Sequence, residues 1–302
     1  AEASYKSATK FKRDYIQAYN NLGVIQYKAG RFIEAEASVK KALDLKPDYA
    51  EGHYTLGNIF KISKRIDEAS ESYERAIALK PNMNYLLGAS LHAKMHQCRW
   101  GDLSQDLTKI TKKINNGEKI LTPFILNSLI DDPSLQRKSA EIYSKDKYPK
   151  SDILPKLTNY QGHKKIRIGY FSANFNNHPV SYLTVELYES HDRNIFEIHG
   201  FSLGPNIKDE FNTRIKAGVD HFHDVSRMSD RDIVMFARSL EIDIAVDLSG
   251  FTEGCRPGIF AMSAASTQVS YIGYPGTMGA NYYDYLISDK TIIPERNKKY
   301  YL

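Results

Sequence analysis

The segment Gly169–Leu183 reads GYFSANFNNHPVSYL and places a histidine–proline pair directly after a predicted strand. A second glycine-rich loop, GYPGTMGA, occupies Gly273–Ala280 and also follows a predicted strand. Open α/β sheets bind ligands at the carboxyl ends of their strands, where helix N-termini point outward. The two loops therefore predict one side of a ligand pocket that contains a histidine.

Short β-rich runs alternate with helical segments from Lys165 onward. This alternation predicts a parallel sheet covered on both faces, a Rossmann-like domain. No Gly-x-Gly-x-x-Gly follows the first strand and no Walker loop is present, so the pattern does not indicate a dinucleotide cofactor. The expected strands are 166–172, 196–203, 221–225, 242–248, 268–271 and 285–288, and the expected helices lie near 181–190, 208–217, 230–240 and 257–263.

The first third of the chain repeats itself at a fixed interval. Leu22-Gly23 returns as Leu56-Gly57, and Leu45-Lys46-Pro47 returns as Leu79-Lys80-Pro81. Each unit predicts two amphipathic helices that bury their apolar faces only by stacking on neighbours, which is the tetratricopeptide pattern. The same interval places Ala1 inside the second helix of an earlier repeat. We therefore expect a chain cut at its N-terminus, with the face that would meet the missing helix exposed.

These patterns divide the chain into three regions and predict an α plus α/β fold. Tetratricopeptide repeats occupy 1–83 with the first repeat truncated, a helical connecting region occupies 84–160, and a Rossmann-like lobe occupies 161–302. A polar, proline-containing stretch over 148–165 predicts the connection between domains. Within the connecting region, helical spacing predicts a packed helix face for His92, Met95, Cys98 and Trp100.

Composition excludes several functional classes. Of 302 residues, 42% are hydrophobic and 25% charged, which is ordinary for a globular protein. The net charge of +5 is spread along the chain, so we expect no nucleic-acid partner. The two cysteines are too few for a disulfide framework and fit a reducing cytosol. Because no apolar run reaches roughly 18 residues and no signal peptide is evident, we expect a cytoplasmic protein without a membrane partner.

Several loop residues have two interpretations each. His178 precedes Pro179, and it either contacts a polar ligand or caps the following helix. Asp247-Leu248-Ser249-Gly250 ends a strand and either faces a ligand or caps a helix. His221 and His223 share one face of a strand, as two metal ligands would, but no third ligand is evident and we expect no metal site.

Taken together, the chain resembles the O-linked N-acetylglucosamine transferases, the tetratricopeptide-containing glycosyltransferase family that includes the plant Spindly proteins. The resemblance is closest to bacterial members. It is carried by the repeats, by the segments LLGASLHAKMHQCRW and TPFILNSLIDDPSLQ, and by four strand-end motifs in family order: RIGYFSANFNNHPVSYL, DLSGFTEGCRPGIFA, YIGYPGTMGA and YDYLISD.

The resemblance implies a GT-B enzyme whose active site lies between two Rossmann-like lobes. This sequence matches the first lobe only, so we expect a fragment that lacks the second lobe and is inactive alone. The implied activity is inverting transfer of N-acetylglucosamine from UDP-GlcNAc to serine or threonine hydroxyls of proteins. Fucose and glucose remain alternative donor sugars. The resemblance implies no cofactor and no metal.

The family's site residues transfer to six positions of the first lobe. His178 matches the histidine that lines the donor-sugar and acceptor site and is the catalytic candidate. The substrate-binding candidates are Asn174, Phe251, Gly273, Tyr274 and Pro275. Members usually have aspartate at the position of Asn174, where a carboxylate could raise the basicity of a nearby group and an amide cannot.

The repeats supply one further candidate and an alternative function. Asn21 fits a family position that grips acceptor proteins in the repeat groove, although its counterpart in the next repeat is Thr55. The alternative to an enzyme is a tetratricopeptide scaffold with a degenerate, non-catalytic lobe. A split enzyme, whose second lobe is a separate polypeptide, is a third possibility.

Overall fold

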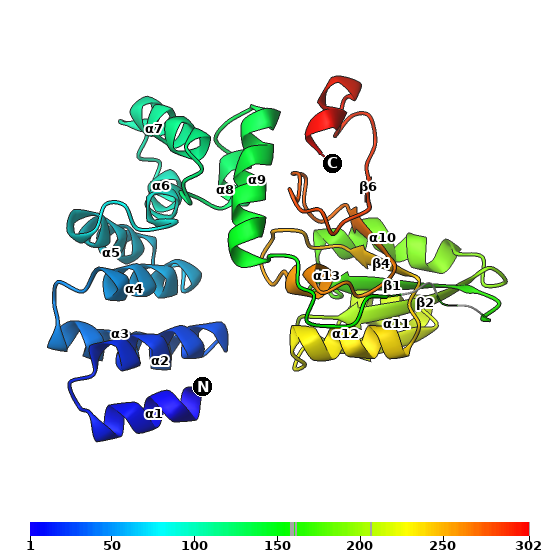
Figure 1. The fold of residues 1–302 in the computed structure, drawn as a ribbon, viewed down its shortest axis with the longest axis horizontal. Helices are drawn as coiled ribbons and strands as arrows, with labels where there is room; N and C mark the ends of the chain where they lie inside the picture. The colour runs from blue at the N-terminus through cyan, green and yellow to red at the C-terminus, as the bar shows by residue number, and fades with distance from the viewer. Residues whose placement is uncertain (158–159, 161, 206, 302) are drawn as a thin grey trace. The chain divides into compact units, whose positions relative to one another are not determined.

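The computed structural model describes residues 1–157, 160, 162–205 and 207–301. They form two compact units, Ala1–Ile125 and Leu126–Leu302 (Figure 1). The predicted connecting region 84–160 is thus shared between the two units. The expected boundary with the sheet domain is between residues 160 and 161. Residues 158, 159 and 161 lie outside the described residues.

The first unit is a stack of helices with the predicted repeat interval. α4 and α5 begin 34 residues after α2 and α3, which confirms the helical array. Its helices are α1 (Glu2–Phe11), α2 (Ile16–Lys28), α3 (Phe32–Leu45), α4 (Ala50–Ile62), α5 (Ile66–Leu79), α6 (Leu86–His96) and α7 (Leu103–Asn115).

Small residues let the paired helices approach closely. A Cβ on Gly23 would lie 2.4 Å from Val39 Cγ2, and one on Gly57 would lie 2.5 Å from the ring of Tyr73. Tyr73 is fully buried and its hydroxyl donates to Asn58 Oδ1 at 2.9 Å. The glycines of the repeat pattern are therefore needed for close packing and not for a turn.

An ion pair recurs at the repeat interval and extends the array to α1. Arg65 contacts Glu36 at 2.6 Å, and 34 residues earlier Arg31 contacts Glu2 at 2.5 Å. α1 thus packs against its neighbour as the second helix of each later repeat does. Among its residues none is buried, and Phe11 is 94% exposed.

The expected packed face around His92 is only partly present. α6 ends at His96, so Cys98 and Trp100 lie beyond the helix and are exposed. Cys98 has a φ of 54°, which is incompatible with continuing a right-handed helix. The prediction was therefore wrong for these two residues.

The second unit contains a six-stranded sheet whose strands all pair in parallel in the order β3-β2-β1-β4-β5-β6 (Figure 1). This confirms the predicted α/β class, and the expected strands match the observed ones within two residues at each end. The strands are β1 (Ile166–Ser172), β2 (Phe196–Ser202), β3 (His221–Asp224), β4 (Ile244–Asp247), β5 (Thr267–Tyr271) and β6 (Tyr285–Ile287).

Helices cover both faces of this sheet. Phe171 and Phe201 stack with centroids 4.4 Å apart on the face covered by α12 and α13, and Tyr170 and Tyr188 pack on the face covered by α10 and α11. The remaining helices of the unit are α8 (Pro123–Asn127), which begins in the first unit, α9 (Pro133–Lys147), α10 (Pro179–Ser190), α11 (Glu210–Gly218), α12 (Asp230–Ser239), α13 (Gly258–Ala261) and a 3₁₀ helix η1 (Glu295–Tyr300).

The polar stretch after α9 packs onto the sheet unit. Leu154 is buried in the core beside α12 and α13, and the Ser151 amide donates to the Ala261 carbonyl at 2.9 Å. Arg238 donates to the Pro155 carbonyl at 2.7 Å. Separately, no helix among the described residues is long and apolar enough to cross a membrane.

Substituting Gly57 by alanine should destabilise the repeat unit. The added methyl group would collide with the buried Tyr73 ring, so we expect the free energy of unfolding to fall by about 1–3 kcal/mol. Alanine's preference for helix interiors, about 1 kcal/mol over glycine, offsets part of the steric cost, and the range above is the net change that we expect.

Urea unfolding followed by circular dichroism measures this effect. Gly101→Ala is the matched control, because a Cβ at Gly101 meets nothing within 4 Å. The control should change the free energy of unfolding by less than about 0.5 kcal/mol. Equal stability of the two variants would contradict the packing argument.

Candidate functional site

The candidate site lies at the carboxyl ends of β1, β4 and β5, which are consecutive neighbours in the sheet. The loops that follow these strands carry six of the sequence-predicted residues. Because all the strands are parallel, their carboxyl ends share one edge of the sheet.

His178 is the N-cap of α10. Its backbone is extended, Pro179 is the first helical residue, and Nδ1 accepts a hydrogen bond from the Val180 amide at 3.2 Å. The capping interpretation is therefore observed. In a neutral imidazole whose Nδ1 is an acceptor, the proton is on Nε2. The half-buried His178 ring can accordingly donate a hydrogen bond from Nε2 while it caps the helix.

Hydrogen bonds at both ends hold the loop between β1 and α10. The backbone amide of Asn174 donates to Ser172 Oγ at 3.0 Å, and the backbone carbonyl of Asn174 accepts from Ser181 Oγ at 2.6 Å. The backbone amide of Asn177 donates to Asp209 Oδ2 at 2.7 Å, and Asp209 also caps α11. Asn174 is half-buried in this fixed loop, and its predicted role in substrate binding stays a prediction.

The loops after β4 and β5 touch backbone to backbone. A Cβ on Gly273 would lie 1.7 Å from the Leu248 carbonyl oxygen, and a Cβ on Gly250 would lie 2.3 Å from Tyr274 Cβ. Gly250 also has a φ of 53°, which favours glycine. Gly273 is thus required for the contact between the loops, whatever else it binds.

Aromatic rings fix the outer part of these loops. Phe251 is 7% exposed and packs edge-on against Tyr143 of α9 at 5.1 Å and against Tyr274 at 5.5 Å. Tyr274 is buried, which raises the pKa of its phenol, and its oxygen accepts from Asn127 Nδ2 at 3.0 Å. These two rings therefore support the loop from inside, whereas Pro275 is exposed.

A pocket of about 350 Å³ adjoins the loop after β5. Its walls are mostly apolar and come from β5, β6 and the segment that precedes η1. The lining residues are Tyr271, Ile272, Tyr274, Pro275, Gly276, Leu286, Ile287, Ser288, Asp289, Ile292 and Ile293. The structure thus brings Tyr274 and Pro275 to one pocket, whereas His178 and Asn174 lie on the loop after β1. The motif YDYLISD ends at Asp289 and supplies part of this lining, whereas the contribution of Ile292 and Ile293 was missed.

Asp247 caps the turn after β4. Its Oδ1 accepts from the amides of Ser249 at 2.9 Å and Gly250 at 3.1 Å, and its Oδ2 accepts from the Tyr283 hydroxyl at 2.5 Å. Complete burial raises the pKa of this carboxyl, and the three hydrogen bonds oppose the rise. Asp247 is therefore a structural group of the turn and not one that faces solvent.

Asn21 lies in α2 of the other unit. Its side-chain Nδ2 is 3.5 Å from the Tyr5 hydroxyl of α1, at the outer limit for a hydrogen bond. Its counterpart Thr55 is buried and bonds the Glu51 carbonyl of its own helix at 2.9 Å. A role for Asn21 in binding acceptor proteins stays a prediction.

The histidines on β3 have neighbours that the sequence did not reveal. His221 and His223 do share one face, but β2 places Glu197 and His199 beside them. We expected no third ligand-type residue beside this pair, and the structure shows that Glu197 and His199 lie there. Spacing along one strand does not show which residues of the next strand lie opposite.

Replacing Asp247 by asparagine should change how stability depends on pH. Because the folded-state pKa lies above 3.8, the folded chain binds the proton more tightly, and the carboxyl's contribution falls as pH rises from 3.8 toward the raised value. Asp247→Asn removes this loss. The free energy of unfolding of the variant, relative to the wild type, should therefore increase with pH in that window.

Urea unfolding over a pH series from about 3 upward measures this difference. Asp132→Asn is the matched control, because hydrogen bonds from Ser134 and Leu135 lower the pKa of Asp132, which caps α9. Its relative stability should change with pH in the opposite direction, and mainly below pH 3.8, because its folded-state pKa lies below that value. A pH-independent difference for Asp247→Asn would contradict the argument.

Comparisons with known proteins agree with this architecture. SEC of Arabidopsis thaliana, named as a probable UDP-N-acetylglucosamine–peptide N-acetylglucosaminyltransferase, is 43% identical over 133 residues, which are 44% of this chain and 14% of SEC. A Caenorhabditis elegans UDP-N-acetylglucosamine–peptide N-acetylglucosaminyltransferase is 35% identical over 138 residues, 45% of this chain and 12% of that protein. The chain therefore spans only a small part of these relatives.

The solved structure of a mutant O-GlcNAc transferase of Thermobaculum terrenum has the same fold. It matches 99% of this chain and 52% of its own, with a TM-score of 0.60 and 24% identity. The tetratricopeptide repeat model matches residues 14–82. The model of glycosyl transferase family 41 matches residues 141–302, more than half of the chain. The chain therefore belongs to glycosyl transferase family 41.

Proposed function

We propose that this chain supplies the first lobe of an inverting glycosyltransferase that moves N-acetylglucosamine from UDP-GlcNAc to serine or threonine hydroxyls of proteins. The relatives named above are described as acting with UDP-N-acetylglucosamine on peptides, and this supports the donor and the acceptor class. The observation that carries the proposal is the position of His178, which caps α10 at the carboxyl end of β1 and keeps an Nε2 donor.

Inverting transfer makes one bond and breaks one. The acceptor oxygen attacks the anomeric carbon, the bond from that carbon to the diphosphate oxygen breaks, and its electrons leave with the nucleotide. The hydroxyl proton must be removed, and charge develops on the leaving group. His178, donating from Nε2, orients an oxygen of the acceptor or of the donor sugar. It is not placed to accept a proton at Nε2 while its Nδ1 caps the helix.

The charge on the leaving diphosphate needs a positive partner. In the loops after β1, β4 and β5 the basic side chain is Arg256, which donates to Asp230 at 2.6 Å and to the Met228 carbonyl at 2.7 Å. These contacts hold the guanidinium in place within the unit. We therefore expect the 302 residues alone to bind uridine diphosphate too weakly to measure, and to be inactive alone.

The repeats would bind the acceptor protein. An open hollow of about 690 Å³ on the repeat unit carries Lys10, Arg13 and Lys41 together with polar residues, a surface suited to extended polar peptide. Asn21 would contribute an amide to the peptide backbone. Asn21 does not line this hollow, and the protein acceptor and the UDP-sugar remain the proposed partners.

Asn174 favours one alternative, a scaffold that binds proteins through its repeats but transfers no sugar. An amide cannot raise the basicity of a neighbouring group as a carboxylate can. The two functions are separated by whether the full-length gene product transfers sugar at all from UDP-GlcNAc. Binding of partner proteins without transfer from any common donor would favour the scaffold.

His178→Asn tests the catalytic proposal directly. Asparagine retains a side-chain acceptor for the Val180 amide, and asparagine is a good N-cap, so α10 should remain capped. Loss of the imidazole donor should lower the transfer rate by about 10²-fold or more. Transfer of labelled N-acetylglucosamine by the full-length gene product, together with thermal unfolding, gives the two readouts.

His178→Ala is the companion variant. It removes cap and donor together, and the loss of the cap should cost about 1 kcal/mol of stability. A near-wild-type transfer rate for His178→Asn would remove His178 from the mechanism.

Calorimetric titration of uridine diphosphate into the 302-residue chain tests the other half of the proposal. We expect no measurable heat of binding. Tight binding would contradict the inference that Arg256 is not available to the diphosphate.

A further inference from the structure

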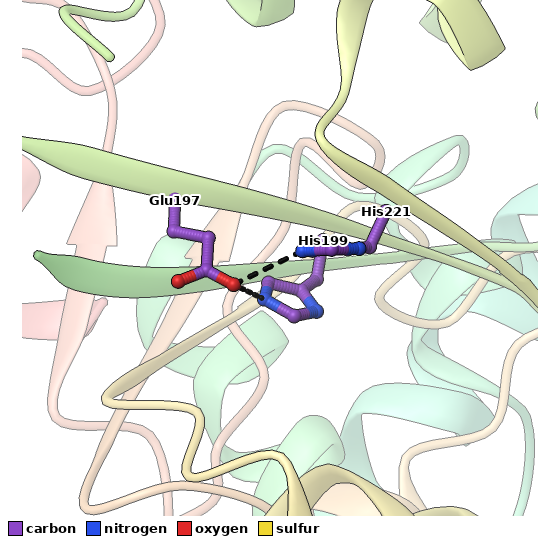
Figure 2. A group of neighbouring side chains, drawn as sticks. All are labelled: Glu197, His199 and His221. Carbon is purple, nitrogen blue, oxygen red and sulfur yellow. Dashed lines mark hydrogen bonds and ion pairs between the residues drawn. The ribbon is translucent and has the colours of Figure 1, made fainter. Parts of the chain in front are cut away.

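A cluster of three ligand-type side chains lies on β2 and β3, away from the candidate site. Glu197 and His199 are on β2 and His221 is the first residue of β3, opposite His199 in the register. The carboxyl ends of these strands are at Ser202 and Asp224, so the cluster lies toward their amino ends. Figure 2 shows the carboxylate of Glu197 directed at both imidazole rings.

The three ligand atoms are close enough to one another for one ion to bridge them. Glu197 Oε1 lies 3.2 Å from His199 Nε2 and 3.1 Å from His221 Nε2, and all three ligand atoms lie within 4.8 Å of one another. A tetrahedral zinc ion with bonds of about 2.0–2.2 Å holds its ligand atoms about 3.3–3.5 Å apart. Small side-chain rotations therefore suffice to place one ion between the three atoms.

We propose that Glu197, His199 and His221 bind one Zn²⁺ ion that links the edge strand β3 to β2. Two imidazoles and one carboxylate are a ligand set that zinc uses in proteins, with water at the fourth position. His221 is 51% exposed whereas His199 is 3% exposed. The ion would therefore be anchored on a buried ligand and be reachable from solvent on the side of His221.

Neighbouring groups support the ligands. His223 Nε2 lies 3.1 Å from His199 Nδ1, so it can accept a hydrogen bond from Nδ1–H when Nε2 of His199 binds the ion. Each ligating imidazole stays neutral, since a proton moves from Nε2 to Nδ1 by exchange with water. His223 is then a positioning residue that fixes the tautomer and orientation of His199.

Arg167 binds the other carboxylate oxygen of Glu197 and not Oε1, which is the oxygen proposed to bind the ion. Arg167 donates to Glu197 Oε2 at 3.2 Å, on the other carboxylate oxygen, and also contacts Glu241 at 3.0 Å. Oε1 thus remains directed at the histidines. Arg167 orients the carboxylate, and Glu241 offsets part of the positive charge.

The alternative is a hydrogen-bonded network that binds no metal. With Nε2 protonated, both histidines donate to Glu197 Oε1 and every contact is satisfied without an ion. The two states predict different behaviour toward Zn²⁺, so a binding measurement decides between them.

Calorimetric titration of ZnCl₂ into the untagged 302-residue chain is the first test. We expect one ion bound per chain, no binding of MgCl₂, and a higher thermal unfolding temperature with Zn²⁺. Co²⁺ at the same site should show the visible absorption of a four-coordinate ion. Absence of saturable Zn²⁺ binding would overturn the proposal.

Substitutions locate the site. His221→Ala and Glu197→Gln should each weaken Zn²⁺ binding by at least about tenfold and abolish the thermal shift. His53→Ala, which changes a histidine of the repeat unit, is the matched control and should bind as the wild type does. Circular dichroism without metal verifies the fold, and His221, half exposed on an edge strand, should tolerate substitution. Unchanged binding in His221→Ala and Glu197→Gln would place the ion elsewhere and overturn the proposal.

Discussion

The close contact between Gly273 and the Leu248 carbonyl determines how the candidate site is built. A side chain at position 273 would place its Cβ 1.7 Å from that backbone oxygen, and a backbone carbonyl cannot rotate out of the way. With glycine there, the loop after β5 lies directly on the end of β4. Tyr274 is then held over Gly250 and beside Phe251. The loops after β4 and β5 consequently behave as one packed layer, which reduces the number of conformations that a ligand must select.

Buried polar groups hold this layer to α9 and to the end of the sheet. Asp247 accepts three hydrogen bonds in the turn after β4, Asn127 donates to Tyr274, and Ser144 of α9 donates to the Met278 carbonyl at 2.7 Å. A buried polar group without a partner would cost more than such a bond contributes, so these pairings select one loop arrangement. The buried residues of the loops thus fix their arrangement, whereas Pro275 stays exposed.

The sequence predicted most of the fold because periodicity is a local property. The interval of 34 residues located the paired helices, and alternation located all six strands, with β1 at its observed bounds. What it did not predict depends on contacts between distant segments. The cluster of Glu197 with His221 needs the register between β2 and β3, and the packing of Tyr143 on Phe251 joins residues more than a hundred positions apart. Helical spacing failed at Trp100 because the helix ends at His96.

His178 shows how a structural requirement limits chemistry. The first amides of a helix have no partner within it, and the Val180 amide is satisfied by His178 Nδ1. Protonating Nδ1 would turn the acceptor into a donor facing that amide, so a charged imidazole would lose the cap. The same hydrogen bond that begins α10 therefore requires an unprotonated Nδ1 while the cap is in place. The capping contact thus commits Nδ1 of His178 to the helix, so any further contact of this imidazole is made through Nε2.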